Sequence, residues 1–377
     1  WQSASFLLKR IYKIRRFCSR PLLRFDSMMQ PSSELIIDYE LVRHNINIIR
    51  NHLPQDSKFM GVVKSNGYGH DLDMTTKALE GSVDGFGVVR LEEAKKIRQT
   101  SKKPILMMQG VYSLEDYNFL KKNDIWTTLH SLSQLPLAEK YLDHLVFWLK
   151  INTGMNRLGI SVNALDQFSA FFKDSNVLMT HLACADKPND ELNKIQLSLF
   201  EDAWKKVGKK MLRSVLNSSG AMNFSDYGHD WSRIGIGMYG GMPNFLNLKT
   251  AMTFRSQIIS IQNLKEGERI GYGGRIKTNR PTNLAIIYCG YADGFPQTAL
   301  DGTLVRVNNR MAPVLGRVSM DLISVDVTEI SDCSIGDWCE FWSPDLPITK
   351  NTETNHLISY ELMTKLSPRV KKQYLNV

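Results

Sequence analysis

The chain has 377 residues, of which 43% are hydrophobic and 23% are charged, and it carries a formal net charge of +9. These values suit a globular enzyme with one large and one smaller domain, and the lack of any run of 18 apolar residues excludes a transmembrane helix. The five cysteines are scattered and form no CxxC pair, which argues against a disulfide framework or a zinc site and favours a reducing, cytoplasmic setting.

The excess positive charge lies in an N-terminal extension. Residues 1–33 contain seven basic residues and one acid, which leaves about +3 for the other 344 residues. An excess confined to a tail argues against a nucleic-acid-binding face on the folded part. The Arg-rich composition is that of a transit peptide or a membrane-surface segment. We favour the simpler alternative, an unstructured extension or a start site placed too early, because Met28 and Met29 directly precede the globular pattern.

Eight short apolar runs alternate with amphipathic, helix-like stretches between about residues 59 and 240. The runs are Phe59–Lys64, Gly85–Val89, Ile105–Met108, Ile125–Thr128, Leu145–Ile151, Val177–His181, Arg213–Leu216 and Trp231–Ile236. Repeated βα alternation implies a parallel sheet. Eight repeats in fewer than 200 residues favour a (β/α)8 TIM-like barrel over an open doubly wound sheet. We assign residues 34–245 to this barrel.

After about residue 245 the pattern becomes that of a mostly β domain, which we assign to residues 246–377. The β-like segments are Arg255–Ile261, Leu284–Cys289, Thr303–Val307 and Ile323–Val327. Gly, Asn and Pro separate them, and a long helical pattern returns only at Glu353–Leu366. The predicted fold class is therefore α/β, a TIM-like barrel followed by a mostly β C-terminal domain.

The first chemical motif is VVKSNGYGH at residues 62–70, in which Lys64 ends an apolar strand and opens a glycine-bearing loop. In a barrel, the C-terminal ends of the strands face the mouth where active sites lie. A lysine placed there can lose solvation, which lowers its pKa and frees the amine to form a Schiff base. A lysine at a strand end is more often a solvated charge, so its position alone does not decide the matter.

The whole string closely resembles the cofactor-lysine motif of the pyridoxal-phosphate-dependent alanine racemases, and other blocks of that family follow in order. They are ELIID with LVRHN (34–38 and 41–45), KINTGMNRLG (150–159), THLACAD (180–186), NSS (217–219), RIGIGMYG (233–240), GYGG (271–274), GYADG (290–294) and GRVSMD (316–321). Agreement over nearly all of the chain from Glu34 onward argues strongly against chance.

The resemblance implies a pyridoxal 5′-phosphate site in the barrel, with Lys64 carrying the cofactor. The other implied cofactor-binding residues are Tyr68, Ser218, Arg233, Gly235 and Ile236. Ser218 and Gly235 follow late strands, where barrels commonly build phosphate sites. Arg233 would face the pyridine nitrogen. A guanidinium stays protonated and cannot give that nitrogen a proton, so the ring is a weaker electron sink and transamination is disfavoured.

The resemblance also implies that Tyr272 is the second catalytic base, opposite Lys64, because a racemase needs acid–base groups on both faces of its substrate. A tyrosine titrates at about pH 10, and positive neighbours such as Arg233, relayed through His181, would lower that value. The implied substrate contacts are Arg157 and Met320, and the supporting residues are His181, Lys150, Tyr291 and Asp321. In related enzymes the lysine at position 150 can carry a carbamate that holds the arginine at position 157. No metal is implied.

The expected function is the interconversion of L-alanine and D-alanine, which supplies D-alanine for cell-wall peptidoglycan. The implied assembly is a head-to-tail homodimer with shared active sites, in which the β domain of one subunit covers the barrel mouth of the other. Tyr272 and Met320 would then act in the partner's site.

Three other protein classes are alternatives to an alanine racemase. A barrel-type decarboxylase of basic amino acids would need a cysteine motif where this chain has GYADG, and a non-catalytic barrel that binds pyridoxal phosphate would lack the β domain. A racemase for serine or a larger amino acid stays open.

The chain also departs from the family pattern at a few positions. Pro368 replaces a frequent tyrosine, which puts one phosphate contact in doubt. Further departures, none of which removes a catalytic group, are at Ser65, Gly67, Asn152 and Asn156.

Overall fold

The computed structural model describes residues 30–242 and 247–377, and residues 31–377 form one compact unit. The basic N-terminal extension predicted for residues 1–33 lies almost wholly outside the described residues. Within the described ranges, no helix combines the length and the apolar character needed to cross a membrane.

Eight parallel strands of the described chain form the first sheet, in the order β8-β7-β6-β5-β4-β3-β2-β9. They are β2 (Lys58–Val62), β3 (Gly85–Val88), β4 (Ile105–Met107), β5 (Trp126–Leu129), β6 (Phe147–Lys150), β7 (Val177–Met179), β8 (Leu212–Ser214) and β9 (Trp231–Ile234). Each coincides with one of the eight apolar runs. The two edge strands, β8 and β9, meet where Ser214 Oγ donates to Trp231 O (2.7 Å), so the sheet curves into a nearly closed barrel.

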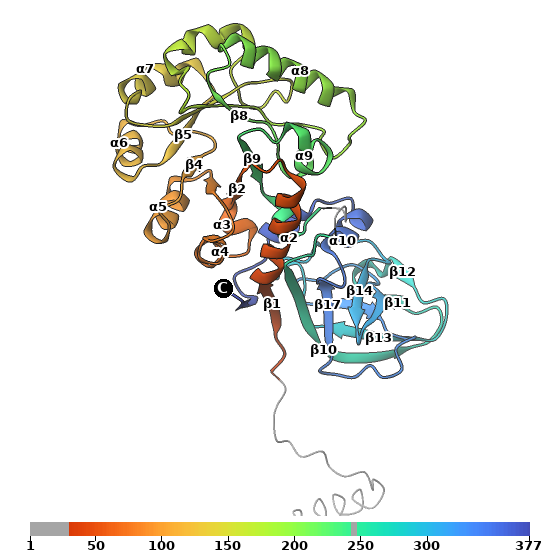
Figure 1. Cartoon of the computed structure of the whole chain (residues 1–377). Coiled ribbons are helices and arrows are strands. Elements are labelled where there is room, and N and C mark those ends of the chain that lie inside the picture. The colour runs from red at the N-terminus through yellow and green to blue at the C-terminus, as the bar shows by residue number, and fades with distance from the viewer. Residues whose placement is uncertain (1–29, 243–246) are drawn as a thin grey trace, which may run out of the picture. The chain divides into compact units, whose positions relative to one another are not determined.

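Helices connect the strands and surround them (Figure 1). They are α2 (Tyr39–His52), α3 (Lys64–Tyr68), α4 (Leu72–Leu79), α5 (Leu91–Thr100), α6 (Leu114–Asn123), α7 (Leu135–Ala138), α8 (Glu191–Lys206) and α9 (Ser218–Asn223). Short 3₁₀ segments supplement them at η2 (Leu132–Gln134), η3 (Glu139–Tyr141), η4 (Val162–Phe171), η5 (Ser225–Tyr227) and η6 (Ile236–Tyr239). The connection between β6 and β7 is thus a 3₁₀ segment rather than an α-helix.

Tryptophans fill the N-terminal end of the barrel. Trp126 and Trp231 begin β5 and β9, and their rings meet edge to face at 5.5 Å. Trp148 packs on Trp231 at 6.0 Å, and the Lys58 ammonium lies 5.5 Å from the Trp231 ring. This end is a packed core, so the opposite end, where the strands finish, is left for polar groups.

The second sheet runs β15-β14-β17-β10-β1-β18, with β13 added to β10 and β16 added to β13. The strands are β1 (Ser33–Asp38), β10 (Met252–Leu264), β13 (Thr282–Ile287), β14 (Leu304–Val307), β15 (Arg310–Pro313), β16 (Ile323–Asp326), β17 (Trp338–Trp342) and β18 (Lys371–Leu375). A separate hairpin joins β11 (Arg269–Ile270) to β12 (Ile276–Lys277). The predicted combination of a TIM-like barrel and a mostly β domain is confirmed.

Two details differ from the sequence pattern. All of β1 except Ser33 falls in residues 34–245, which the sequence assigns to the barrel, yet β1 pairs with β10 and β18. The helical pattern at Glu353–Leu366 is not one helix, because α10 (Ile348–Asn355) ends where His356 adopts a left-handed conformation (φ 53°) and α11 (Ser359–Thr364) begins anew. A non-glycine residue at positive φ ends a helix because it cannot continue the right-handed turn.

Candidate active site

The C-terminal ends of the barrel strands carry most of the residues singled out in the sequence. Lys64 lies two residues beyond β2, Lys150 is the last residue of β6, and His181 lies two residues beyond β7. Ser218 follows β8, and Arg233 lies in β9 next to the strand's end. A parallel barrel brings these ends together at one mouth, so five side chains of four chemical types, from distant parts of the chain, meet there.

The segment α3 is not a right-handed helix, because the four residues after Lys64 have left-handed backbone; we call them the left-handed run (residues 65–68). Ser65, Asn66, Gly67 and Tyr68 have φ values of 54°, 55°, 63° and 53°. For L-residues other than glycine this conformation costs roughly 1–2 kcal/mol each, so surrounding contacts must hold the run in place. Gly69 follows at φ 85°, and a Cβ there would lie 2.1 Å from the carbonyl oxygen of Met363.

Lys64 belongs to a group of positive side chains, of which Lys150 and Arg233 are buried, Lys64 is half-buried and Arg157 is exposed. Burial, then Arg157, lowers the pKa of Lys64, while Glu93 raises it. Burial, then Arg233, Arg157 and Lys64, lowers the pKa of Lys150 to about 8. Among the described residues, no carboxylate forms an ion pair with Lys64, Lys150, Arg157 or Arg233. Uncompensated positive charge in a buried place is costly, so these residues fit an anionic ligand.

Arg233 is 3% exposed and donates only to oxygens of the main chain and of one serine. Nη1 donates to Ser214 O (3.0 Å) and to Ser214 Oγ, and Nη2 donates to Thr180 O and Val215 O. Burial lowers the pKa of Arg233 to about 10, which still leaves the guanidinium charged at neutral pH. The carbonyls of three residues thus hold a cation where a carboxylate partner would be usual.

Replacing Lys150 by methionine should make unfolding less dependent on pH. Lys150 is 8% exposed, and its amine has a pKa of about 8, against 10.5 when unperturbed. Between those values the unfolded chain binds more protons, so the wild-type protein gains stability as pH rises. Lys150→Met has no such amine, so the free energy of unfolding of the wild type should rise relative to that of the variant by about 3 kcal/mol from pH 8 to pH 10.5. Urea unfolding at several pH values would measure this difference. A pH-independent difference would contradict a free amine at this position.

The predicted phosphate contacts lie together after β8 and β9. Ser218 Oγ accepts from the N–H groups of Gly235 (3.0 Å) and Gly237 (3.1 Å), which fixes the loop between β9 and η6. A Cβ at position 235 would lie 2.6 Å from the hydroxyl of Tyr68. The glycine therefore lets Tyr68, from the left-handed run, approach this loop. Ile236 begins η6 directly beside these groups, so the four predicted contacts form one cradle.

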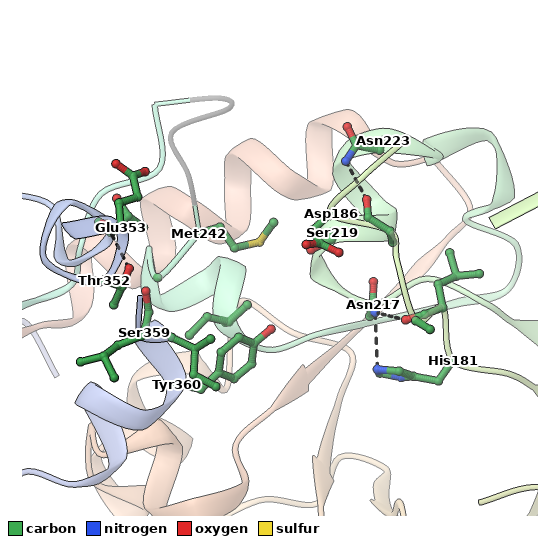
Figure 2. A pocket seen from close by; sticks show the side chains of 18 of the residues that line it. His181, Asp186, Asn217, Ser219, Asn223, Met242, Thr352, Glu353, Ser359 and Tyr360 are labelled. Carbon is green, nitrogen blue, oxygen red and sulfur yellow. Dashed lines mark hydrogen bonds between the residues drawn. The ribbon is translucent and has the colours of Figure 1, made fainter. Parts of the chain in front are cut away.

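A cavity of about 460 Å³ adjoins the cradle. Figure 2 shows His181 and Asn217 on one side and Tyr360, from α11, on the other. Nε2 of His181 lies 3.4 Å from Nδ2 of Asn217, and burial, then Arg233 and Lys150, lowers the pKa of His181 well below its usual value. His181 is therefore neutral and links the cavity to the positive group.

Two asparagines shape the loop that carries Arg157. Asn152 Oδ1 accepts from the N–H groups of Gly154 (3.1 Å) and Asn156 (3.0 Å). Asn156 has φ 54°, a conformation that asparagine tolerates better than most residues. The two asparagines at these positions therefore supply the acceptor and the left-handed residue that the conformation of this loop requires.

The predicted β-domain residues do not line the cavity beside the cradle within one chain. In the β domain, Tyr272 lies in the turn η7 (Tyr272–Gly274) between β11 and β12 and is 69% exposed, and Met320 is 54% exposed.

The remaining predicted β-domain residues surround Met320. Tyr291 is exposed and its N–H donates to Ser319 O (3.1 Å). The carboxylate of Asp321 pairs with Arg369 (2.6 Å), the residue that follows Pro368. Within the described residues no cluster of His, Cys, Asp or Glu side chains is arranged to hold a metal ion.

The structure adds residues that the sequence reasoning did not assign. Glu93 accepts from Ser65 N–H (2.7 Å), directly after Lys64, and Tyr360 lies 5.9 Å, ring to ring, from Tyr68. The sequence offered one signal for Glu93, because it is a glutamate in the first turn of the helix after β3. Nothing in the local sequence marks Tyr360, because α11 reaches the cradle only through the fold.

The chain matches two family descriptions, "Alanine racemase, N-terminal domain" over residues 37–243 and "Alanine racemase, C-terminal domain" over residues 251–374. An alanine racemase of Mannheimia succiniciproducens is 37% identical over 361 residues, which covers 92% of this chain and all of the relative.

Solved structures agree with these sequence matches. A biosynthetic alanine racemase from Pseudomonas aeruginosa has a TM-score of 0.84 at 32% identity, with 92% and 99% of the two chains covered. An alanine racemase from Bartonella henselae, with covalently bound pyridoxal phosphate, has a TM-score of 0.81 at 26% identity, with 91% and 99% covered. The resemblance seen in the sequence is thereby confirmed, and the chain belongs to the alanine racemase family.

Proposed function

We propose that this protein interconverts L-alanine and D-alanine with pyridoxal 5′-phosphate held by Lys64, and that the D-alanine serves cell-wall peptidoglycan synthesis. The observation that carries the proposal is the positive group formed by buried Lys150 and Arg233, half-buried Lys64 and exposed Arg157, with which no carboxylate of the described residues forms an ion pair. An anionic cofactor and a substrate carboxylate would supply the missing negative charge. The family membership and the covalent cofactor of the Bartonella henselae relative support this assignment.

The cradle of Tyr68, Ser218, Gly235 and Ile236 would hold the cofactor phosphate. Its supports are the Ser218 hydroxyl, the Tyr68 hydroxyl and the N–H group of Ile236 at the start of η6. Hydroxyl and backbone N–H groups are suitable donors to a phosphate.

Pyridoxal phosphate, when bound, makes the α-proton of an attached amino acid acidic, which the free amino acid does not allow. Lys64 would remove that proton from D-alanine, since burial favours the neutral amine that a base requires. Tyr272 would remove it from L-alanine on the opposite face. Return of a proton from the face opposite to the one that lost it inverts the centre. Arg157, together with Met320 of the partner subunit, would orient the substrate carboxylate.

Arg233 would face the ring nitrogen of the cofactor and keep it without a proton. The guanidinium is held by carbonyl oxygens rather than by an acid, so no neighbouring carboxyl group can deliver a proton there. Neutral His181 lies beside it and would connect Arg233 to the second base by hydrogen bonds. Tyr291 and Asp321 would have supporting roles, because both lie beside Met320 on the surface of the β domain.

Replacing Arg233 by glutamate should slow racemisation and increase transamination relative to it, because a carboxyl group can stabilise a protonated ring nitrogen. The carbonyls of Thr180 and Ser214 would lose their donor, so Arg233→Gln is the matched control. Glutamine restores a donor but supplies no acid. Product analysis should find pyruvate formation raised in Arg233→Glu alone. Equal partitioning in both variants would show that Arg233 does not face the ring.

The active unit would be a head-to-tail homodimer. Exposed hydrophobic side chains mark both surfaces that such a dimer would join, with Tyr112 and Leu132 in the loops after β4 and β5 at the barrel mouth and Tyr272 and Met320 on the β domain. Large exposed apolar groups of this kind mark interaction surfaces. A two-fold axis would place each β domain over the partner's barrel mouth and create two equal sites.

Two measurements test the proposed function. An absorbance band of lysine-bound cofactor in the purified protein, abolished by borohydride, would establish the covalent link. Chiral chromatography with alanine, serine and larger amino acids would then establish the substrate, and preference for serine would replace alanine in the proposal. We also propose a cytoplasmic location, because the four described cysteines are free thiols, as a reducing compartment would keep them.

A further inference from the structure

The left-handed run joins the two groups that the proposed function assigns to the cofactor. Lys64 precedes it and Tyr68 ends it, so the conformation of the intervening backbone sets where the amine lies relative to the phenol. The left-handed conformation is intrinsically unfavourable for this run, because three of its four residues are not glycine. Two side chains outside the run contact its two ends.

His70 holds the C-terminal end. Its Nδ1 lies 3.2 Å from Gly67 O and 3.1 Å from Tyr68 O, and both carbonyls are acceptors. Nδ1 must therefore carry the proton. His70 is fully buried, its Nε2 has no partner among the described residues, and burial lowers the pKa of the ring to about 4, so the ring is neutral. The ring also stacks on the ring of Tyr239, with 4.3 Å between the ring centres. Tyr239 ends η6, whose first residue, Ile236, belongs to the cradle.

Glu93 holds the N-terminal end. Its Oε1 accepts from Ser65 N–H (2.7 Å), and its Oε2 accepts from the N–H groups of Val89 and Arg90 (both 3.1 Å). The carboxylate thus ties the residue after Lys64 to the end of β3 and the start of α5. It also raises the pKa of Lys64, which partly offsets the effect of burial.

We propose that His70 and Glu93 are positioning residues. They hold the left-handed run at its two ends by hydrogen bonds and so fix the Lys64 amine and the Tyr68 hydroxyl in the relative positions that the cofactor requires. The inference rests on the proposed function for the roles of Lys64 and Tyr68. Packing alone does not account for His70, because an apolar ring would fill the same space without burying an unpartnered nitrogen.

Two substitutions at position 70 separate the hydrogen bond from the ring stack. The side-chain nitrogen of asparagine occupies nearly the place of Nδ1, so His70→Asn keeps the donor and loses the stack. His70→Phe keeps the stack on Tyr239 and loses the donor. Exposed His44 on α2 offers a control, since His44→Gln removes a histidine without touching the run.

The decisive readout is cofactor affinity, measured by titrating pyridoxal phosphate into the full-length protein after its cofactor has been removed. His70→Phe should weaken binding about tenfold, because two buried carbonyls lose a donor. His70→Asn should stay within about twofold of wild type. The melting temperatures of the cofactor-free variants are measured alongside, so that a general loss of stability is recognised. In the loaded enzymes, kcat should fall in the phenylalanine variant while KM for alanine changes little.

Glu93→Gln is a second test that leaves the core intact. Glutamine has one acceptor oxygen, so it cannot satisfy Ser65 and the Val89–Arg90 pair together, and cofactor affinity should again fall several-fold. Equal cofactor affinity in His70→Asn and His70→Phe, or losses that simply follow melting temperature, would overturn the positioning role. If the wild-type chain forms no lysine-bound cofactor at all, the proposed function fails first and this inference falls with it. If wild type binds normally and all variants bind equally well, only the positioning role fails.

Discussion

Lys64→Ala should reduce racemisation by at least about 10³-fold and abolish the absorbance band of lysine-bound cofactor. The substitution removes both the amine that holds the cofactor and the base assigned to D-alanine, and a general base alone contributes about 10² to 10⁴-fold. The buried amine of Lys150 shares the barrel mouth but projects from β6, four strands away in the sheet, so it does not occupy the position of the Lys64 amine.

Lys58→Ala is the matched control for this experiment. Lys58 begins the same strand, β2, but lies at the tryptophan-filled end of the barrel, with its ammonium 5.5 Å from the Trp231 ring. Its loss should leave both the band and the activity close to wild type. A Lys64→Ala protein with a band of normal intensity would refute the assignment of Lys64, whatever its activity.

Tyr272→Phe should nearly abolish racemisation while leaving cofactor binding intact, because it removes only the base for L-alanine. The decisive experiment mixes this inactive variant with inactive Lys64→Ala and lets the subunits exchange. If Tyr272 acts in the partner's site, each heterodimer contains one site with both bases and one site with neither. Activity should then return, in the heterodimer, to at most about half of the wild-type value.

The exposed position of Tyr272 makes this test sharp. With 69% of its surface accessible, the side chain packs against little in its own chain, so Tyr272→Phe should leave the unfolding temperature unchanged. Tyr288→Phe, at another exposed tyrosine of the β domain, serves as control and should stay active. No recovery despite demonstrated exchange would refute action in the partner's site, and a fully active monomer would refute the need for a dimer.

The sequence alone determined the barrel, the mostly β domain and the family. Eight apolar runs at regular spacing can bury their side chains only in a parallel sheet with helices outside, and each run became a strand. The strand-end position of Lys64 and the order of the glycine-bearing blocks are also local properties of the chain. Both can be read from the sequence without knowing how the strands are arranged in space.

Only the tertiary structure decided how these pieces meet. The left-handed run could not be predicted, because Ser65, Asn66 and Tyr68 adopt a conformation that their own preferences oppose and that contacts with Glu93 and His70 hold. The pairing of β1 with the distant β10 and β18 was hidden as well, since strand pairing depends on surfaces that the fold itself creates. The chain contains many acids, but the fold places none of those in its described part in an ion pair with buried Lys150 or Arg233, which the sequence alone could not predict.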